Sequence, residues 1–213
     1  TYGGAENEDV TLPTAAQLLP TNEYPLVFSS TNTTKAVNTG RWSYSATLAP
    51  CIQWEYMDLR ASAGKPWDIL KRSNTAGLNV IRNCTLTNTQ GNASACLIAN
   101  YKGAPSMLVV TDCIMNITSG LGVFYFPGDY VRGLTCRRNK GVIQSLGQFD
   151  SMRGSLVVEN NLFYRSSIAD EFIHITGSPN FSIIMDQNTL SGFGTIIYTD
   201  ASTNDAGDGA QHL

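Results

Sequence analysis

The middle of the chain repeats one pattern of apolar and polar positions five times. Residues 80–86 read apolar, any, polar, Asn/Asp/Gln, Cys/Asn, any, apolar, and the pattern starts again at 109, 136, 157 and 184, most weakly at 136. The starts lie 21 to 29 residues apart. A sustained repeat of this length is typical of solenoid proteins, in which each repeat packs against its neighbours.

Each copy predicts a strand, a bend and a second strand. Position four carries Asn, Asp or Gln, whose side chains bond to nearby backbone at bends, and positions one and seven are expected to point inward. Because equivalent residues of stacked strands lie about 4.8 Å apart, asparagines at position five are expected to form an internal hydrogen-bonded ladder. Position five holds, in order, Cys84, Cys113, Lys140, Asn161 and Asn188.

A further apolar strand follows each copy, and the intervening segments carry no pattern typical of an amphipathic helix. About 25 residues with two or three short strands form one coil of a β-solenoid. The sequence therefore predicts an all-β fold, a parallel β-solenoid of about five to seven rungs. The additional strands are expected at residues 96–99, 122–126, 142–146, 172–175 and 195–198.

The two ends of the chain differ from the repeats. Residues 1–50 contain prolines at 13, 20, 25 and 50, and the open end of a solenoid must be covered if its strands are not to pair with other chains. We expect an N-terminal cap or docking segment at 1–50, a parallel β-helix at 51–200 and a flexible Gly/Asp/Asn-rich tail at 201–213. Strand addition to a neighbouring copy would use apolar residues of the first segment, namely Val10, Leu12, Leu26 and Phe28.

Composition narrows the classes of partner. Of the 213 residues, 42% are apolar and only 15% charged, and the net charge is −3. This balance provides no basic face for a nucleic acid, and no apolar run approaches the roughly 18 residues of a membrane span. Low charge and faces rich in Thr, Asn and Ser favour an extracellular or cell-surface protein.

The cysteine pattern argues against a metal centre. The chain has five cysteines and two histidines, no CxxC pair, and His174 lies far from His212 in sequence. We therefore predict no metal site and no cofactor. Cys84 and Cys113 occupy equivalent positions on adjacent coils and are expected to be stacked, inert core thiols.

The repeats resemble the right-handed parallel β-helix of pectate-lyase-like proteins, and the heptapeptides are similar to β-helix modules of secreted surface proteins in Bacteroidota. The resemblance covers about residues 78–200 and is specific to the fold. It implies a right-handed coil and a substrate that lies along one sheet face and the adjoining bend. The outward residues of the second-strand face are then glycan-binding candidates by ring stacking and hydrogen bonding: Tyr125, Gln144, His174 and Tyr198. The alternative is an ordinary strand surface, where such residues are favoured anyway.

Carboxylates lie near the ends of these strands, at Asp129, Asp150, Asp170, Glu171 and Asp200. Asp129 and Asp150 follow strands of neighbouring coils and are candidates for a glycosidase pair, which needs carboxylates about 5–9.5 Å apart. His174 is a candidate general base, although turn residues are commonly Asp for backbone reasons alone.

A lyase would add calcium as a cofactor. Residues 170–175 resemble the acidic strand motif of alginate and chondroitin lyases. Those families continue with Lys-Ser, where this chain has Thr176-Gly177-Ser178, so the expected base is missing.

Three functions fit these observations. The favoured one is a non-catalytic extracellular β-solenoid, a structural or adhesive subunit that self-assembles head to tail and contacts glycans. One alternative is a polysaccharide lyase or glycoside hydrolase, which rests on fold analogy alone. The other is a fragment of a viral tail-spike or appendage, which predicts a trimer.

Overall fold

The computed structural model describes twelve stretches of the chain: residues 10–12, 26–30, 35–38, 42–44, 52–60, 78–88, 98–99, 106–127, 131–150, 153–165, 171–176 and 180–200. All of these residues lie in strands, bends or short connections, and none lies in a helix. Within these stretches no helix is long and apolar enough to cross a membrane. The predicted tail at 201–213 lies outside the described residues.

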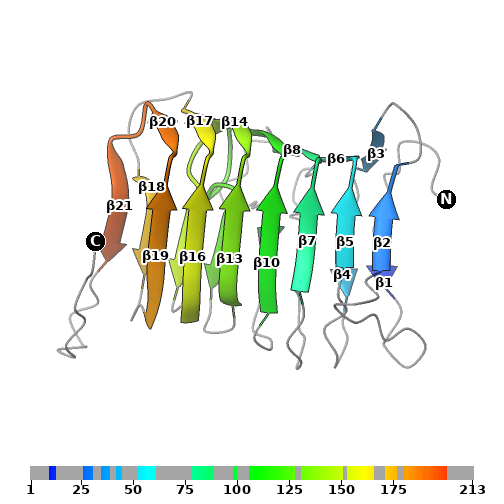
Figure 1. Cartoon of the computed structure of the whole chain (residues 1–213), viewed down its shortest axis with the longest axis horizontal. Helices are drawn as coiled ribbons and strands as arrows, with labels where there is room; N and C mark the ends of the chain where they lie inside the picture. The colour runs from blue at the N-terminus through cyan, green and yellow to red at the C-terminus, as the bar shows by residue number, and fades with distance from the viewer. Residues whose placement is uncertain are drawn as a thin grey trace.

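Three parallel sheets share the same coils (Figure 1), and β1 (Val10–Leu12) and β4 (Trp42–Tyr44) form a separate two-stranded sheet. The front sheet contains β2 (Leu26–Ser29), β5 (Ile52–Glu55), β7 (Leu78–Arg82), β10 (Ser106–Thr111), β13 (Val131–Arg137), β16 (Arg153–Glu159) and β19 (Asn180–Asp186). The upper sheet contains β3 (Ala36–Asn38), β6 (Met57–Arg60), β8 (Thr85–Asn88), β11 (Ile114–Ile117), β14 (Lys140–Ile143), β17 (Leu162–Tyr164) and β20 (Thr189–Ser191).

The rear sheet closes the coil and contains β9 (Ile98–Ala99), β12 (Phe124–Pro127), β15 (Gly147–Asp150), β18 (Glu171–Thr176) and β21 (Thr195–Asp200). The chain rises along the front sheet, crosses the upper sheet and descends behind, advancing each time toward the C-terminal end (Figure 1). This path is a right-handed coil, the hand expected of parallel crossovers. The predicted parallel β-solenoid is confirmed.

The N-terminal segment contributes to the same sheets. β2 pairs with β5 and β3 pairs with β6, so two strands of the predicted cap or docking segment extend the front and upper sheets. Val10 and Leu12 belong to β1 (Val10–Leu12), which pairs in parallel with β4 (Trp42–Tyr44) of the same chain. Phe28 stacks on the fully buried Trp54 of the next coil, with ring centroids 6.4 Å apart.

A single residue with a left-handed backbone makes the bend between the front and upper sheets. Its φ is positive at Tyr56, Asn83, Asp112, Arg138, Asn160 and Gln187. Asn and Asp tolerate this conformation better than other side chains, which explains their recurrence at position four. The weakest copy was misplaced by one residue: Arg138 makes its bend, so the copy starts at Thr135 and position five is Asn139 rather than the exposed Lys140.

The bend also shifts the inward positions. Position two is buried, as at Ile81 and Val110, whereas Val80 and Val109 at position one are only half-buried on the outer surface. The prediction for position one was therefore wrong, and that for position seven holds at Leu86. The physical reason is that the left-handed residue interrupts the two-residue alternation of the strand.

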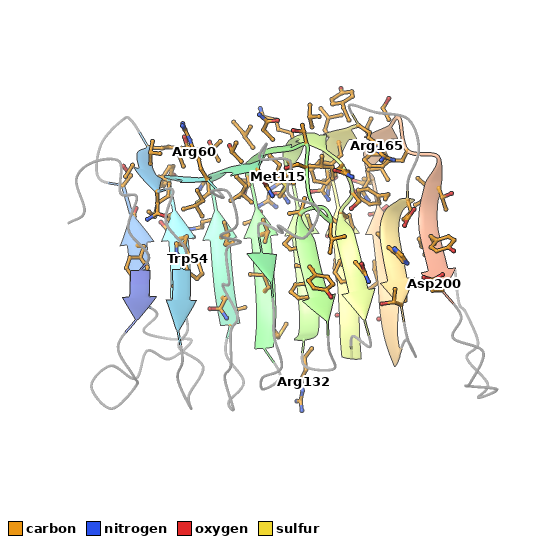
Figure 2. The ribbon with its side chains drawn as sticks, turned by 180° about the vertical axis from the view of Figure 1, so that it is seen from behind. Trp54, Arg60, Met115, Arg132, Arg165 and Asp200 are labelled. Carbon is orange, nitrogen blue, oxygen red and sulfur yellow. The ribbon has the colours of Figure 1, made fainter. Side chains whose placement is uncertain are left out.

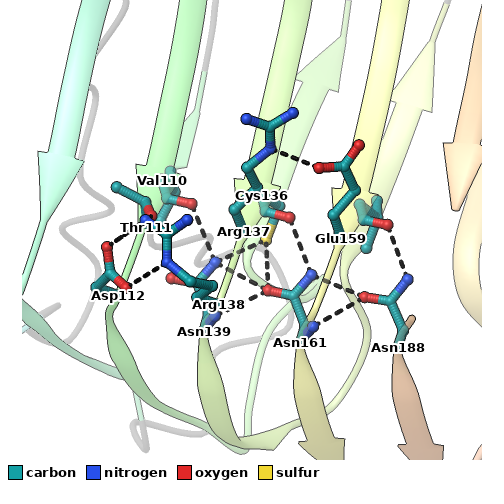
Figure 3. A network of polar contacts seen from close by, with 11 residues as sticks. Val110, Thr111, Asp112, Cys136, Arg137, Arg138, Asn139, Glu159, Asn161 and Asn188 are labelled. Carbon is teal, nitrogen blue, oxygen red and sulfur yellow. Dashed lines mark hydrogen bonds and ion pairs between the residues drawn. The ribbon is translucent and has the colours of Figure 1, made fainter. Parts of the chain in front are cut away.

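The residues at position five form an internal column, defined by Cys84, Cys113, Asn139, Asn161 and Asn188. Figure 3 shows its three asparagines. Asn161 Oδ1 accepts hydrogen bonds from the backbone N–H and from Nδ2 of Asn139, at 2.9 and 3.1 Å. Asn188 Oδ1 accepts the same two bonds from Asn161, at 3.0 and 2.9 Å. The predicted asparagine ladder is confirmed, with Asn139 in place of Lys140.

One predicted strand was misplaced. The apolar run at 142–146 was expected to be a second strand, but β14 ends at Ile143 and the rear-sheet strand β15 begins at Gly147. Residues 144–146 turn the chain between the two sheets. Gly147 has φ +147°, and a Cβ there would lie 2.0 Å from the Phe124 carbonyl oxygen, so only glycine fits this strand start.

The C-terminal coil is less buried than the coil before it. Leu156, Val158 and Phe163 are fully buried. Their partners one coil later, Ile183, Met185 and Leu190, are only partly buried against the core.

Candidate functional site

The outer face of the rear sheet carries one column of aromatic and polar side chains. Tyr125, Gln148, His174 and Tyr198 lie in register on four adjacent strands. Three of the four predicted glycan-binding candidates therefore share one column. Gln148 takes the register position that had been expected for Gln144, because β15 begins later than predicted.

Gln144 nevertheless reaches the same place from the side. It lies in the bend before β15, where its backbone N–H donates to the Ile117 carbonyl oxygen at 2.7 Å. Together with Gln148 and His174 it lines a shallow hollow of about 150 Å³. The remaining lining residues are Gly120, Leu121, Ser145 and Glu171.

The wall of this hollow is fixed by a local hydrogen bond and a close approach. Ser145 Oγ donates to the Leu121 carbonyl oxygen at 3.0 Å. Gly122 has φ +110°, and a Cβ there would come within 2.2 Å of Ser145 Oγ. Residues 121 and 122 of one coil are therefore packed closely against Ser145 of the next, where the chain passes from the upper sheet to the rear sheet.

His174 is held between two carboxylates. Its Nδ1 lies 2.9 Å from Glu171 Oε1, and its Nε2 lies 3.2 Å from Asp200 Oδ2. The edge of its ring meets Tyr198, with centroids 5.1 Å apart and planes at 79°. His174 and Glu171 are about three-quarters buried, whereas Asp200 is 57% exposed. Figure 2 shows Asp200 on β21, at the free edge of the sheet.

Tyr198 belongs to the same cluster. The neighbouring Asp200 carboxylate favours the protonated hydroxyl and raises the pKa of Tyr198, with smaller contributions from burial and from the charge of Glu171. The cluster of Glu171, His174, Tyr198 and Asp200 is the acidic end of the column.

The strands of the rear sheet carry acidic residues but no permanently charged basic ones. None of the five rear-sheet strands contains Lys or Arg, although they contain Asp150, Glu171 and Asp200. The arginines instead pair with carboxylates near the bend at the front sheet, as in Arg137 with Glu159 at 2.7 Å. The other such pairs are Arg82 with Glu55 and Arg138 with Asp112.

The predicted glycosidase pair is not tested by the structure. Asp150 ends β15, where its backbone lies between Pro127 and Thr176 of the neighbouring strands. Asp129 lies outside the described residues. Among the residues that the structure describes, no group of three or more His, Cys, Asp or Glu side chains is arranged to hold a metal ion. Calcium stays a prediction tied to the lyase alternative.

Two members of the cluster, Glu171 and Asp200, were noted in the sequence only as carboxylates near strand ends. Their proximity to His174 follows from the register of β18 with β21, which pairs His174 with Tyr198 and Thr176 with Asp200. Alignment of these two strands, which lie one coil apart, is the signal that would have found them.

The three thiols that the structure describes lie in the core and not on the outer surface. Cys84, Cys113 and Cys136 are free and buried. Burial raises the pKa of the Cys136 thiol to about 12, and the hydrogen bond with Cys84, together with burial, raises that of Cys113 well above its usual range. The prediction of buried core thiols at Cys84 and Cys113 is confirmed.

Comparisons with known proteins give no information on function, so the fold and this site are the basis for the function proposed below. No family model, curated protein or solved structure matches the chain.

Proposed function

We propose that the protein is a non-catalytic, extracellular β-solenoid that acts as a structural or adhesive subunit and holds a glycan along the outer face of its rear sheet. The observation that carries the proposal is the column of Tyr125, Gln148, His174 and Tyr198 beside a shallow hollow. The likeness of the repeats to pectate-lyase-like proteins, in which substrate usually lies along one sheet face and the adjoining bend, supports the choice of this face.

The spacing of the column suits a linear polysaccharide. Neighbouring strands lie about 4.8 Å apart, and a pyranose residue extends a polymer by roughly the same distance, so successive coils can meet successive sugars. Tyrosine rings supply apolar area for sugar faces, and the amides of Gln144 and Gln148 supply donors and acceptors for hydroxyl groups. The hollow is shallow, which suits contact with a chain better than enclosure of a small ligand.

The test is binding to a panel of soluble polysaccharides, measured by affinity electrophoresis and calorimetry. Tyr198→Ala should weaken the best ligand by about five- to tenfold, the value of one lost ring contact. Its matched control is Tyr164→Ala, because Tyr164 is similarly exposed (47% against 44%) but lies on the upper sheet. Equal binding by both variants, or no binding across the panel, would overturn the proposal.

The same assay separates binding from catalysis. If the protein is a lyase or hydrolase, incubation will shorten the polysaccharide, and His174→Ala will abolish the shortening. A chain length that stays constant while binding is retained supports a non-catalytic role.

Self-association is a second candidate, favoured by the C-terminal coil. Its inward residues Ile183, Met185 and Leu190 are only partly buried, and β19, β20 and β21 are each the last strand of a sheet. Exposed edges of parallel sheets accept strands from another copy, and such contacts between unlike surfaces build open assemblies.

Light scattering and electron microscopy in native buffer test this second candidate. The protein should form fibres or large assemblies that Leu190→Asp abolishes, whereas Ile114→Asp, an exposed site on the outer face of the upper sheet, should leave them intact. A monomer at every concentration removes the idea, and a discrete trimer favours the tail-spike alternative.

A further inference from the structure

The carboxylates of the rear-sheet strands indicate which class of glycan this face binds. We infer that the glycan held along this face carries free amino groups, as in a polymer of deacetylated hexosamine. This inference rests on the proposed function and adds to it the chemistry that selects the ligand.

The first argument is the sign of the charge around the column. The rear-sheet strands contain three carboxylates and neither Lys nor Arg. An anionic polymer would meet Glu171 and Asp200 with no arginine or lysine of these strands to offset them, and close like charges disfavour a partner. A polymer with ammonium groups meets the opposite potential, which also speeds its association.

The second argument is the placement of the two carboxylates within the proposed site. Glu171 lines the hollow beside Gln144 and Gln148, and Asp200 lies at the edge of the same cluster with 57% of its side chain exposed. Each carboxylate contacts His174 through one oxygen, at 2.9 Å for Glu171 and 3.2 Å for Asp200. A carboxylate can accept several hydrogen bonds, so capacity remains for an ammonium group that approaches along the column.

The third argument is the aromatic ring at the same place. Tyr198 packs edge-to-face against His174 and lies two residues before Asp200 on β21, so both side chains share the outer face of that strand. The side chain of Tyr198 is 44% exposed. A sugar that stacks on this ring places its substituents within reach of Asp200. An aromatic face beside a carboxylate is an arrangement that attracts ammonium groups by both cation–π and charge interactions.

The same charge pattern argues against a uronate-containing polymer as the ligand. A uronate or sulfated polymer needs positive groups to neutralise its acids, and three arginines along the front bend are instead paired with Glu55, Glu159 and Asp112. The lyase alternative, which rests on such polymers, predicts the opposite order of affinities.

The experiment compares three oligosaccharides of equal length by calorimetry: a fully deacetylated chito-oligosaccharide, its N-acetylated form and an oligogalacturonate. The deacetylated form should bind best, and its affinity should fall with added salt. Glu171→Gln and Asp200→Asn should each weaken it by about three- to tenfold and weaken the neutral form by a smaller factor. The matched control is Asp186→Asn, an exposed carboxylate of the front sheet, which should change neither.

The outcomes distinguish the two proposals. If the neutral form binds as tightly as the amine, or the carboxylate variants have no effect, the amine inference is wrong while glycan binding stands. Preferential binding of oligogalacturonate also overturns the inference. If none of the three oligosaccharides binds and the wider polysaccharide panel also fails, the proposed function itself is wrong.

Discussion

The internal column of the solenoid has a C-terminal half made of amides and an N-terminal half made of thiols. The side chains of both halves lie against backbone carbonyls of the preceding coil. In the C-terminal half, Asn139, Asn161 and Asn188 each donate from Nδ2 to a carbonyl of the preceding coil, at 3.0, 2.9 and 2.7 Å. In the N-terminal half, the Sγ atoms of Cys84 and Cys113 lie 3.5 and 3.8 Å from the equivalent carbonyls.

The asparagines also accept hydrogen bonds from the coil before them. Asn139 Oδ1 accepts the backbone N–H of Cys113 at 2.9 Å, and Asn161 Oδ1 and Asn188 Oδ1 accept those of Asn139 and Asn161. Each asparagine therefore serves one backbone donor and one backbone acceptor of the preceding coil. The comparison teaches that either a thiol or an amide can fill this position, and that the amide makes the stronger hydrogen bonds.

The largest effect is expected from breaking the amide half. Asn161→Ala leaves the Asn139 backbone N–H and the Cys136 carbonyl without their partners in a buried site. Each loss costs about 1–3 kcal/mol, so the free energy of unfolding should fall by about 3 to 5 kcal/mol in urea denaturation.

The control for that measurement is Asn188→Ala in the same ladder. Asn188 is only partly buried, and water can replace its bonds, so the loss should be smaller, about 1 to 2 kcal/mol. Equal losses at the two positions would show that burial does not govern the strength of the ladder.

An intermediate effect is expected from the thiol beside the ladder at high pH. The folded protein holds the pKa of Cys136 at about 12, whereas an unfolded thiol has a pKa of about 8.5. A raised pKa in the folded state gives stability that is fully present below pH 8.5 and is lost as pH rises toward 12. Between about pH 8.5 and 10.5 the expected loss is roughly 2 to 3 kcal/mol.

The measurement is the urea midpoint at several pH values for the natural protein and for Cys136→Val. The variant has no thiol to ionise, so its stability should decline less steeply over the same interval. Parallel curves for the two proteins would contradict the assigned role of Cys136.

The smallest effect is expected from exchanging one half for the other. Cys113→Asn should change the free energy of unfolding by less than about 1 kcal/mol, because Asn139 shows that an amide fits this column and finds a carbonyl. Cys113→Leu, which offers neither donor nor acceptor and is larger, should cost about 2 to 3 kcal/mol. A loss with Asn as large as with Leu would show that the two halves are not equivalent.

The fold could be predicted from the sequence because its signal repeats. Five copies of one heptapeptide identify the coil, and the Asn and Asp residues at position four mark the left-handed bend. The copy near 136 was placed one residue late because Arg138, rather than Asn139, takes the bend, and Arg gives no local signal for that conformation.

The candidate site could be predicted only in part. Tyr125, His174 and Tyr198 follow from strand alternation, whereas Gln148 depends on where β15 begins, and that start is fixed by the close approach of Gly147 to the Phe124 carbonyl. The clustering of Glu171 and Asp200 around His174 depends on the register between two strands that are separated by a complete coil.

The sequence by itself determined the repeat, the β-solenoid and the asparagine ladder, because each is a local pattern that recurs every coil. Only the tertiary structure decided which residues of neighbouring coils meet on the rear sheet, since the coils differ in length and their register is set by bends and glycine contacts. The separation of acidic residues on that sheet from arginines along the front bend is a consequence of this register. It is the feature from which the ligand class was inferred.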